Sequence, residues 1–193
     1  MARPQEFDTE AALNSAMRVF WSKGFEATSL VDLMQATGLS KSSLYGAFGD
    51  KRDLFLSAYD AYRRDRAREM RLILETGSAR QAIETFFCKI INDAAVVEPS
   101  NGCMSTNQAV ELAPHDALVR NRVETDFQLI EDALAQTVER GQREGSIRPG
   151  TDPRKLARLL VVAFPGLQVM VRAGSAKPRL TDAMELLLSS LDP

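Results

Sequence analysis

Apolar residues recur at helical spacing along nearly the whole chain, and this periodicity constrains the fold more than any other feature. Leu13, Met17 and Phe20, for example, lie four and three residues apart. Alternation of apolar and polar residues, which would indicate strands, is hard to find, and glycine and proline are sparse. We therefore expect an all-α protein with helices near 8–23, 29–37, 40–48, 50–76, 80–95, 103–113, 116–144, 152–173 and 181–191.

Composition narrows the class of protein without naming a function. The 193 residues are 45% hydrophobic and carry a formal net charge of −2, so a protein that coats nucleic acid non-specifically is disfavoured. The two cysteines form no CxxC pair, which indicates a reducing compartment. The most apolar stretch, 159–171, is interrupted by Pro165 and Gln168 and is shorter than the roughly 18 residues a membrane helix needs. We expect a cytoplasmic protein without a membrane segment.

The stretch QATGLSKSSLYGAFGDKRDLF, residues 35–55, has the pattern of a helix-turn-helix. Two short helices, 29–37 and 40–48, are joined by a turn at Gly38, and glycine is common in such turns. In the second helix Leu44 and Phe48 are four apart and share the face that must be packed. The other side carries Lys41, Ser42, Tyr45 and Gly46. A cation, a hydroxyl and a phenol near a helix N-terminus suit phosphates and groove edges, so this face is predicted to contact DNA.

The longer segment TSLVDLMQATGLSKSSLYGAFGDKRDLF, residues 28–55, resembles the DNA-binding signature of TetR-family transcriptional regulators, and the resemblance extends over about 7–60. It implies a homodimer in which each three-helix head reads one half of a palindromic operator in double-stranded DNA. It also implies a larger helical domain that binds a small molecule and pairs the subunits. On this basis we expect a DNA-binding head over 1–50, a connecting helix over about 50–76, and an effector-binding and dimerisation domain over 51–193.

Carried over residue by residue, the resemblance implies DNA contacts at Thr28, Lys41, Ser42, Tyr45 and Lys51, with Tyr45 and Lys51 mainly on phosphates and Thr28 anchoring the second helix. This chain departs from the family where the positions after the tyrosine, often His or another large polar residue, are Gly46 and Ala47. A glycine inside a helix costs about 1 kcal/mol relative to alanine. Gly46 is therefore expected to allow close approach of the backbone to DNA while removing a base contact.

The segment SNGCMSTNQAVELAPHD, residues 100–116, is the second candidate site. Cys103 lies at the expected start of a helix, where the dipole favours a thiolate. Some TetR-family regulators with a similar Gly-Cys before a helix carry an electrophile- or oxidant-sensing cysteine, so the resemblance makes Cys103 a candidate sensor. The alternative is a small buried residue at a helix entry, and Cys88 is expected to be plain core. Candidate apolar walls of a ligand pocket are Phe86, Phe87, Ile90, Met104, Phe127, Phe164 and Met170, with Asn107 and Gln108 as polar contacts. Residues of these kinds are more often plain core than pocket wall.

Other functions are weakly supported. His115 is the only histidine, and the cysteines lack zinc-ligand spacing, so neither a metal site nor a cofactor is expected. An enzyme could be built from Cys103 as nucleophile and His115 as base, with Asp116 or Glu111 as the orienting group. These residues come from one short segment and nothing nearby indicates an oxyanion hole, so no catalytic residue is assigned. The sequence favours a repressor released by a small-molecule or thiol-reactive effector, and the second alternative is a DNA-binding protein without an effector site.

Overall fold

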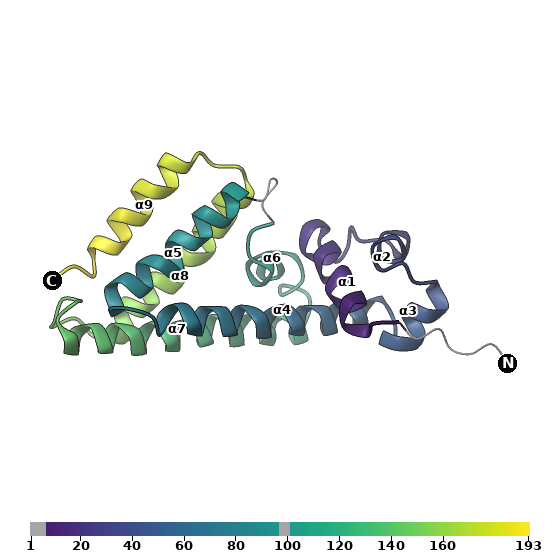
Figure 1. Ribbon diagram of the computed structural model, residues 1–193, viewed down its shortest axis with the longest axis horizontal. Coiled ribbons are helices and arrows are strands. Elements are labelled where there is room, and N and C mark those ends of the chain that lie inside the picture. Colours follow the sequence, from purple (N-terminus) through teal and green to yellow (C-terminus); the bar gives the residue numbers. More distant parts are fainter. Residues whose placement is uncertain (1–6, 97–100) are drawn as a thin grey trace. The chain divides into compact units, whose positions relative to one another are not determined.

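The computed structural model describes residues 7–96 and 101–193, and within these ranges the chain is helical without a strand, as the periodicity predicts (Figure 1). The predicted helix ends are confirmed to within one or two residues for eight of the nine described helices. The described helices are α1 (Thr9–Lys23), α2 (Leu30–Thr37), α3 (Lys41–Phe48), α4 (Lys51–Leu74), α5 (Ala79–Val96), α6 (Met104–Glu111), α7 (Ala117–Glu144), α8 (Pro153–Arg172) and α9 (Lys177–Ser189).

The last helix begins four residues earlier than expected. Thr181 was expected to cap it, but α9 starts at Lys177 and Pro178 lies in its first turn. Proline is well tolerated there because the first amides of a helix have no intrahelical partner and the fixed φ of proline already suits the helix. The residue that suggested a loop is therefore part of the helix start.

The chain divides into two compact units, Met1–Asp65 and Arg66–Pro193, and the division falls inside α4. In the first unit, capping residues define the short helices. Ser29 and Asp32 form a reciprocal capping box at the start of α2, and Gly38 ends α2 in the left-handed conformation with φ of 71°. Ser40 then caps α3 through a 3.2 Å bond from the amide of Ser43.

The core of this first unit is aromatic. Phe20 of α1 and Phe55 of α4 are fully buried, with ring centroids 5.3 Å apart in an edge-to-face arrangement. Leu33 of α2 and Leu44 of α3 are also fully buried, so each helix contributes to one core. Because α3 is held from behind by Leu44, its opposite side remains available to solvent.

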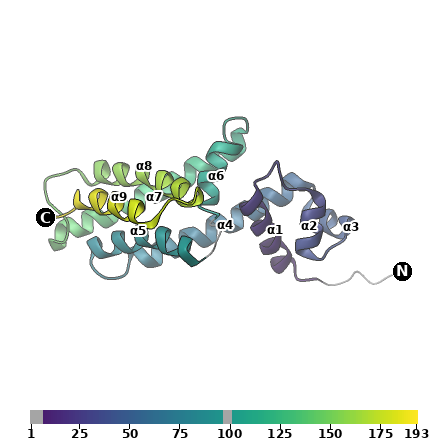
Figure 2. The ribbon, with the colours of Figure 1, turned by 90° about the horizontal axis from the view of Figure 1, so that it is seen from above.

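In the second unit, α5, α7, α8 and α9 pack around a continuous apolar core, and α6 packs on α7 and α8 (Figures 1 and 2). The turn between α4 and α5 is held by the far end of α7. The guanidinium of Arg140 donates to the carbonyl of Leu74 at 2.8 Å, and the carboxylate of Glu144 accepts from the amide of Ala79 at 2.6 Å. That amide, with the hydroxyl of Ser146, lowers the pKa of Glu144. No helix among the described residues is apolar over a length that could cross a membrane.

Candidate functional site

The N-terminal turn of α3 is organised by a cluster of serine hydroxyls. The hydroxyl of Ser40 lies 3.0 Å from that of Ser42 and 3.0 Å from that of Ser43, in addition to capping the helix. The predicted DNA-contacting hydroxyl of Ser42 is therefore already engaged with the cap in this structure. The cluster fixes the start of α3.

The predicted contact residues of α3 reach the surface of the head. Lys41, Ser42 and Gly46 are exposed, and Tyr45 is half-buried. The ammonium of Lys41 lies 5.9 Å from the centroid of the Tyr45 ring. The structure thus places these four residues on one short helix, with a cation and a phenol side by side and a bare backbone position near its middle.

Two further predicted residues lie outside α3. Lys51, at the start of α4, has its ammonium 4.4 Å from the centroid of the Phe25 ring, a cation–π contact that orients the side chain. Thr28 is 1% exposed, and its hydroxyl donates to the carbonyl of Gly24 at 2.5 Å. Gly24 ends α1, so this bond fixes the connection between α1 and α2. The structure places Thr28 inside the head, where it supports α2.

An ion pair that the sequence analysis missed joins α1 to α2. The ammonium of Lys23 lies 2.6 Å from a carboxylate oxygen of Asp32. This bond, together with bonds from the amide and hydroxyl of Ser29, lowers the pKa of Asp32 to about 2. The capping-box pattern identified Asp32. Its pairing with Lys23 could not be predicted, because the two residues are nine apart and belong to different helices.

The low pKa of Asp32 predicts a pH-dependent contribution to the stability of the head. A carboxyl whose pKa is depressed by folding stabilises the fold above its unfolded pKa, about 3.9, and loses that contribution as pH falls through its folded value. Wild type should therefore melt at a higher temperature than Asp32→Asn at pH 7, and the difference should shrink between pH 4 and pH 2. Circular dichroism melts across this range measure it, with the exposed Asp65→Asn as control. A difference that stays constant over the range would contradict the prediction.

In the second unit, Cys103 immediately precedes α6. It occupies the N-cap position without a side-chain capping bond and is 8% exposed. Gly102 before it has φ of 63°, and a Cβ there would lie 3.1 Å from the carbonyl of Gln168 in α8. The glycine thus lets the chain pass close to α8 as it enters α6. Cys88 instead packs with its thiol 3.8 Å from the sulfur of Met184, and burial raises the pKa of that thiol.

Polar side chains are buried on α6. Ser105 donates to the carboxylate of Asp126 at 2.6 Å, and the amide nitrogen of Gln108 donates to Glu111 at 3.0 Å. Gln108 is fully buried and Thr106 is 2% exposed. Among the described residues, neither the Thr106 hydroxyl nor the Gln108 carbonyl oxygen has a hydrogen-bond partner. Buried polar atoms without partners are uncommon, so this helix retains unused capacity to bind a polar group.

Most of the predicted pocket residues are packed in the interior. Phe87, Ile90 and Phe164 belong to the apolar core, and Met104 is fully buried. Phe86 stacks on Phe164 and Met170 packs against the same core. The half-buried Asn107 donates to the carbonyl of Asn101 at 3.0 Å.

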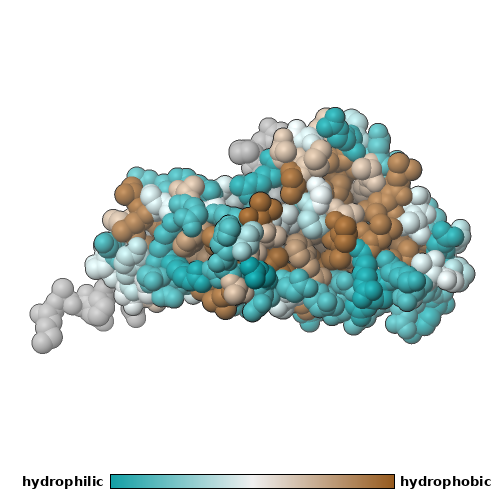
Figure 3. Space-filling view, turned by 180° about the vertical axis from the view of Figure 1, so that it is seen from behind, coloured by the Kyte–Doolittle hydropathy of each residue, from teal (hydrophilic) through white to brown (hydrophobic). Residues whose placement is uncertain are grey.

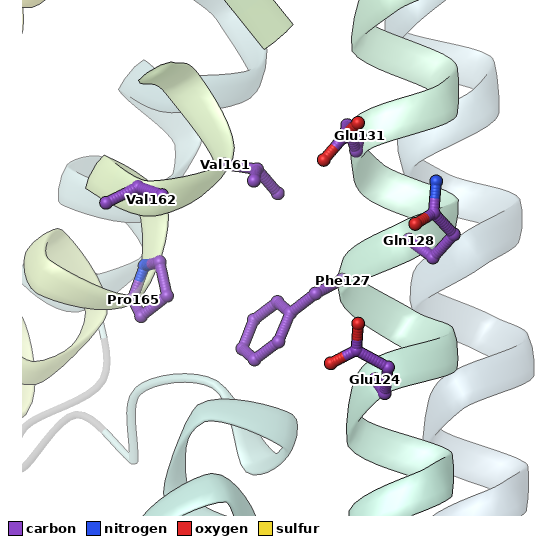
Figure 4. A pocket seen from close by; sticks show the side chains of 7 residues that line it. All are labelled: Glu124, Phe127, Gln128, Glu131, Val161, Val162 and Pro165. Atoms are coloured by element: carbon purple, nitrogen blue, oxygen red, sulfur yellow. The ribbon is translucent and has the colours of Figure 1, made fainter. Parts of the chain in front are cut away.

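A pocket of about 370 Å³ lies between α7 and α8 (Figure 4). Phe127, one of the predicted pocket residues, lines it. Its ring points from α7 toward α8. Glu131 at one side of the pocket is paired with Arg154 at 3.3 Å and Arg158 at 3.2 Å. The lining residues are Glu124, Phe127, Gln128, Glu131, Val161, Val162 and Pro165.

The groups considered for an enzyme have structural partners. Asp116 caps α7 by accepting from the amides of Leu118 and Val119, and Glu111 accepts from Gln108. His115 is exposed in the turn between α6 and α7. Within the described ranges, no three histidine, cysteine or carboxylate side chains are grouped as metal ligands.

Comparison with known proteins agrees with this arrangement. Residues 12–58 match the family described as "Bacterial regulatory proteins, tetR family", and residues 77–187 match "Tetracyclin repressor-like, C-terminal domain". The chain is 34% identical to the HTH-type transcriptional regulator YezE of Bacillus subtilis over 100% of both chains. It is 33% identical to the HTH-type transcriptional repressor ComR of Escherichia coli, over 92% of this chain and 86% of ComR.

Among solved structures, a cysteine-substituted form of the TetR-family regulator CifR, in complex with a 26-base-pair double-stranded operator, superposes with a TM-score of 0.85. It is 27% identical, and the match covers 98% of this chain and 100% of that one. The relatives named here are regulators, and the enzyme alternative finds no support among them. The chain therefore belongs to the TetR family and is a DNA-binding transcriptional regulator.

Proposed function

We propose that this regulator is a repressor that binds a palindromic operator as a homodimer and is released by an effector acting in its helical domain. The observation that carries the proposal is the exposed side of α3, where Lys41 and Tyr45 lie together beside the bare position Gly46. We assign these residues, with Ser42 and Lys51, to the DNA contact. Thr28 supports the head from inside through its bond to Gly24.

We assign different roles to different parts of the chain. Residues 1–50 form the DNA-binding head, α4 connects it to the rest, and the remainder of 51–193 binds the effector and pairs the subunits. Because a repressor of this kind acts on operator DNA, we place the protein in the cytoplasm. The relative ComR is named as a repressor, and CifR is described in complex with double-stranded operator DNA, which supports this role.

The proposed pairing surface is an apolar row on α8, here called the α8 stripe: Leu159, Val162, Gly166 and Val169. These positions recur three and four residues apart, so they share one side of the helix. Leu159, Val162 and Val169 are 47%, 75% and 48% exposed, which is unusual for large apolar side chains at helical spacing. Gly166 has open space around its missing Cβ, so another helix can approach the backbone there. Leu186 of α9 is 76% exposed, and we include it in the proposed pairing surface.

A second copy of the chain is the occupant that this stripe fits. An apolar stripe on one helix, repeated on a copy related by a two-fold axis, is self-complementary and forms a four-helix bundle with α9 of both copies. Figure 3, seen from behind the view of Figure 1, shows apolar side chains gathered over the helical domain.

The proposed effector site is the start of α6. Cys103 is the sensing residue for a thiol-reactive compound, and the unpartnered Thr106 hydroxyl follows it by three residues on the same side of the helix. A non-covalent small molecule bound at α6 remains the second possibility, because the unpartnered Gln108 oxygen calls for a hydrogen-bond donor. Either ligand would favour a conformer whose two recognition helices no longer match successive major grooves, roughly 34–36 Å apart.

Fluorescence anisotropy tests the proposal. The protein is titrated into duplexes that tile its own upstream region and into a scrambled duplex, at two salt concentrations. We expect one tile to bind at least tenfold more tightly than the scrambled duplex, and a thiol-reactive compound to release it. Cys103→Ser should bind that tile normally and resist release, while Cys88→Ser should behave as wild type. Release that persists in Cys103→Ser would exclude the thiol sensor, and no release by any compound would favour a regulator without an effector site.

A further inference from the structure

Helical glycines are informative here because each lowers helix stability and so calls for a reason. Three glycines lie inside the described helices: Gly46 of α3, Gly141 of α7 and Gly166 of α8. The reason for Gly141 is internal, since a Cβ there would lie 2.5 Å from Ile147 and 2.9 Å from Ala79. A Cβ at Gly46 would meet nothing within 4 Å. Nothing inside the head therefore requires glycine at this position.

Gly46 lies at the centre of the outward side of α3. It is two residues from the fully buried Leu44 and two residues from the half-buried Phe48, and two helical residues subtend roughly 200°. Gly46 thus points away from the core more directly than Lys41 or Tyr45. Whatever α3 is laid against comes closest to the helix axis at Gly46.

The polar groups around Gly46 are short and already engaged. Ser42 and Ser43 are the nearest hydroxyls toward the helix start, and both lie 3.0 Å from the hydroxyl of the cap residue Ser40. Ala47 follows and is exposed. No long donor or acceptor occupies this centre, so the bidentate hydrogen bonds by which Arg, Asn or Gln distinguish bases cannot form there.

We propose that α3 reads a thymine at this centre through the shape of its C5-methyl group, which enters the space left by the missing Cβ of Gly46 and packs against Ala47. The thymine methyl is the apolar group that a base pair presents in the major groove, and small apolar side chains are its usual partners. Close approach of the backbone at Gly46 makes the contact tight. Lys41 and Tyr45 hold the phosphates that set this approach.

The inference rests on the proposed operator binding, and its test separates the two. The test uses the operator identified by the anisotropy titrations. Each thymine of a half-site is replaced singly by deoxyuridine, which removes the methyl group and keeps the base pair. We expect one position per half-site to lose affinity about fourfold, the ratio that burial of one methyl group supports. Replacing that pair by 5-methylcytosine·guanine should bind more tightly than cytosine·guanine. If the protein binds the operator selectively but deoxyuridine has no effect at any position, the inference about thymine is overturned while the proposed operator binding stands.

The protein side of the test is Gly46→Ala, with Ser57→Ala on the exposed side of α4 as control. Alanine has room at position 46 and is the better helix former, so the melting temperature of the free protein should rise. Operator affinity should fall at least tenfold. The variant should bind the operator with thymine and the operator with deoxyuridine at the sensitive position equally well. A Gly46→Ala variant that binds as tightly as wild type, or that keeps the deoxyuridine effect, would overturn the proposal.

Discussion

Replacing Val162 by glutamate should turn the dimer into a monomer and reduce operator affinity by a factor of about 100 or more. Val162 is 75% exposed at the middle of the α8 stripe, so the fold of a single chain tolerates the change. In the dimer the new carboxylate would be buried without a partner, which costs roughly 3–5 kcal/mol. Without pairing, each head binds its half-site alone and the combined affinity of two linked contacts is lost.

The chain offers a closely matched control for this experiment. Val110 of α6 is 74% exposed and lies outside the α8 stripe. Val110→Glu therefore introduces the same charge at the same exposure and should remain a dimer with normal operator binding. Light scattering after gel filtration reports the mass, and anisotropy reports operator affinity. A Val162→Glu protein that remains dimeric would place the pairing surface elsewhere.

The second large effect is expected at Tyr45. A hydrogen bond from its phenol to a phosphate is one to a charged acceptor, worth about 1.5–3 kcal/mol, and a dimer makes it twice. Tyr45→Ala should thus lower operator affinity by about 100-fold or more. Tyr45→Phe should show most of this loss, because it removes the hydroxyl that binds the phosphate. It keeps the ring beside Lys41, so the loss can be attributed to the hydroxyl.

Salt dependence separates the role of Tyr45 from that of its neighbour. Lys41 neutralises a phosphate and releases counterions, so Lys41→Ala should reduce the slope of log K against log salt by about 1 per half-site. Neither Tyr45 variant should change the slope, because neither substitution removes a cation from the contact with DNA. Anisotropy titrations from about 50 to 200 mM salt measure both quantities. Full affinity in Tyr45→Phe would show that the hydroxyl does not hold a phosphate.

Local signals carried most of what could be predicted about the head. Ser29, Asp32, Gly38 and Ser40 are capping and turn residues whose preferences act over three or four positions, and the structure confirms the helix ends they indicated. Thr28 shows the limit of such signals. Its place in the motif is clear, but its burial depends on how the connection between α1 and α2 packs in the head, which no local spacing records.

Roles in the second unit were harder to predict, because they too depend on how the helices pack. An apolar stripe shows which side of a helix avoids water, but core packing, a pocket wall and a pairing surface all satisfy that demand. Phe127 lines the described pocket whereas Phe87 is fully buried in the core, although both appeared equally suitable in the sequence. Whether the buried oxygens of Thr106 and Gln108 have partners depends on the packing around α6, which the spacing of residues in the sequence does not record.

The α8 stripe also bears on how this regulator selects its pairing partner. Between Leu159 and Val169 its outward positions are valine and glycine, which offer shape but no hydrogen bonds. Selectivity among partners normally relies on charges or polar groups that penalise the wrong match. A stripe without them discriminates by fit alone, so a paralogue with a similar row on its own α8 would compete for this chain. Such a mixed pair would carry two different recognition helices and would read a non-palindromic operator that neither homodimer recognises.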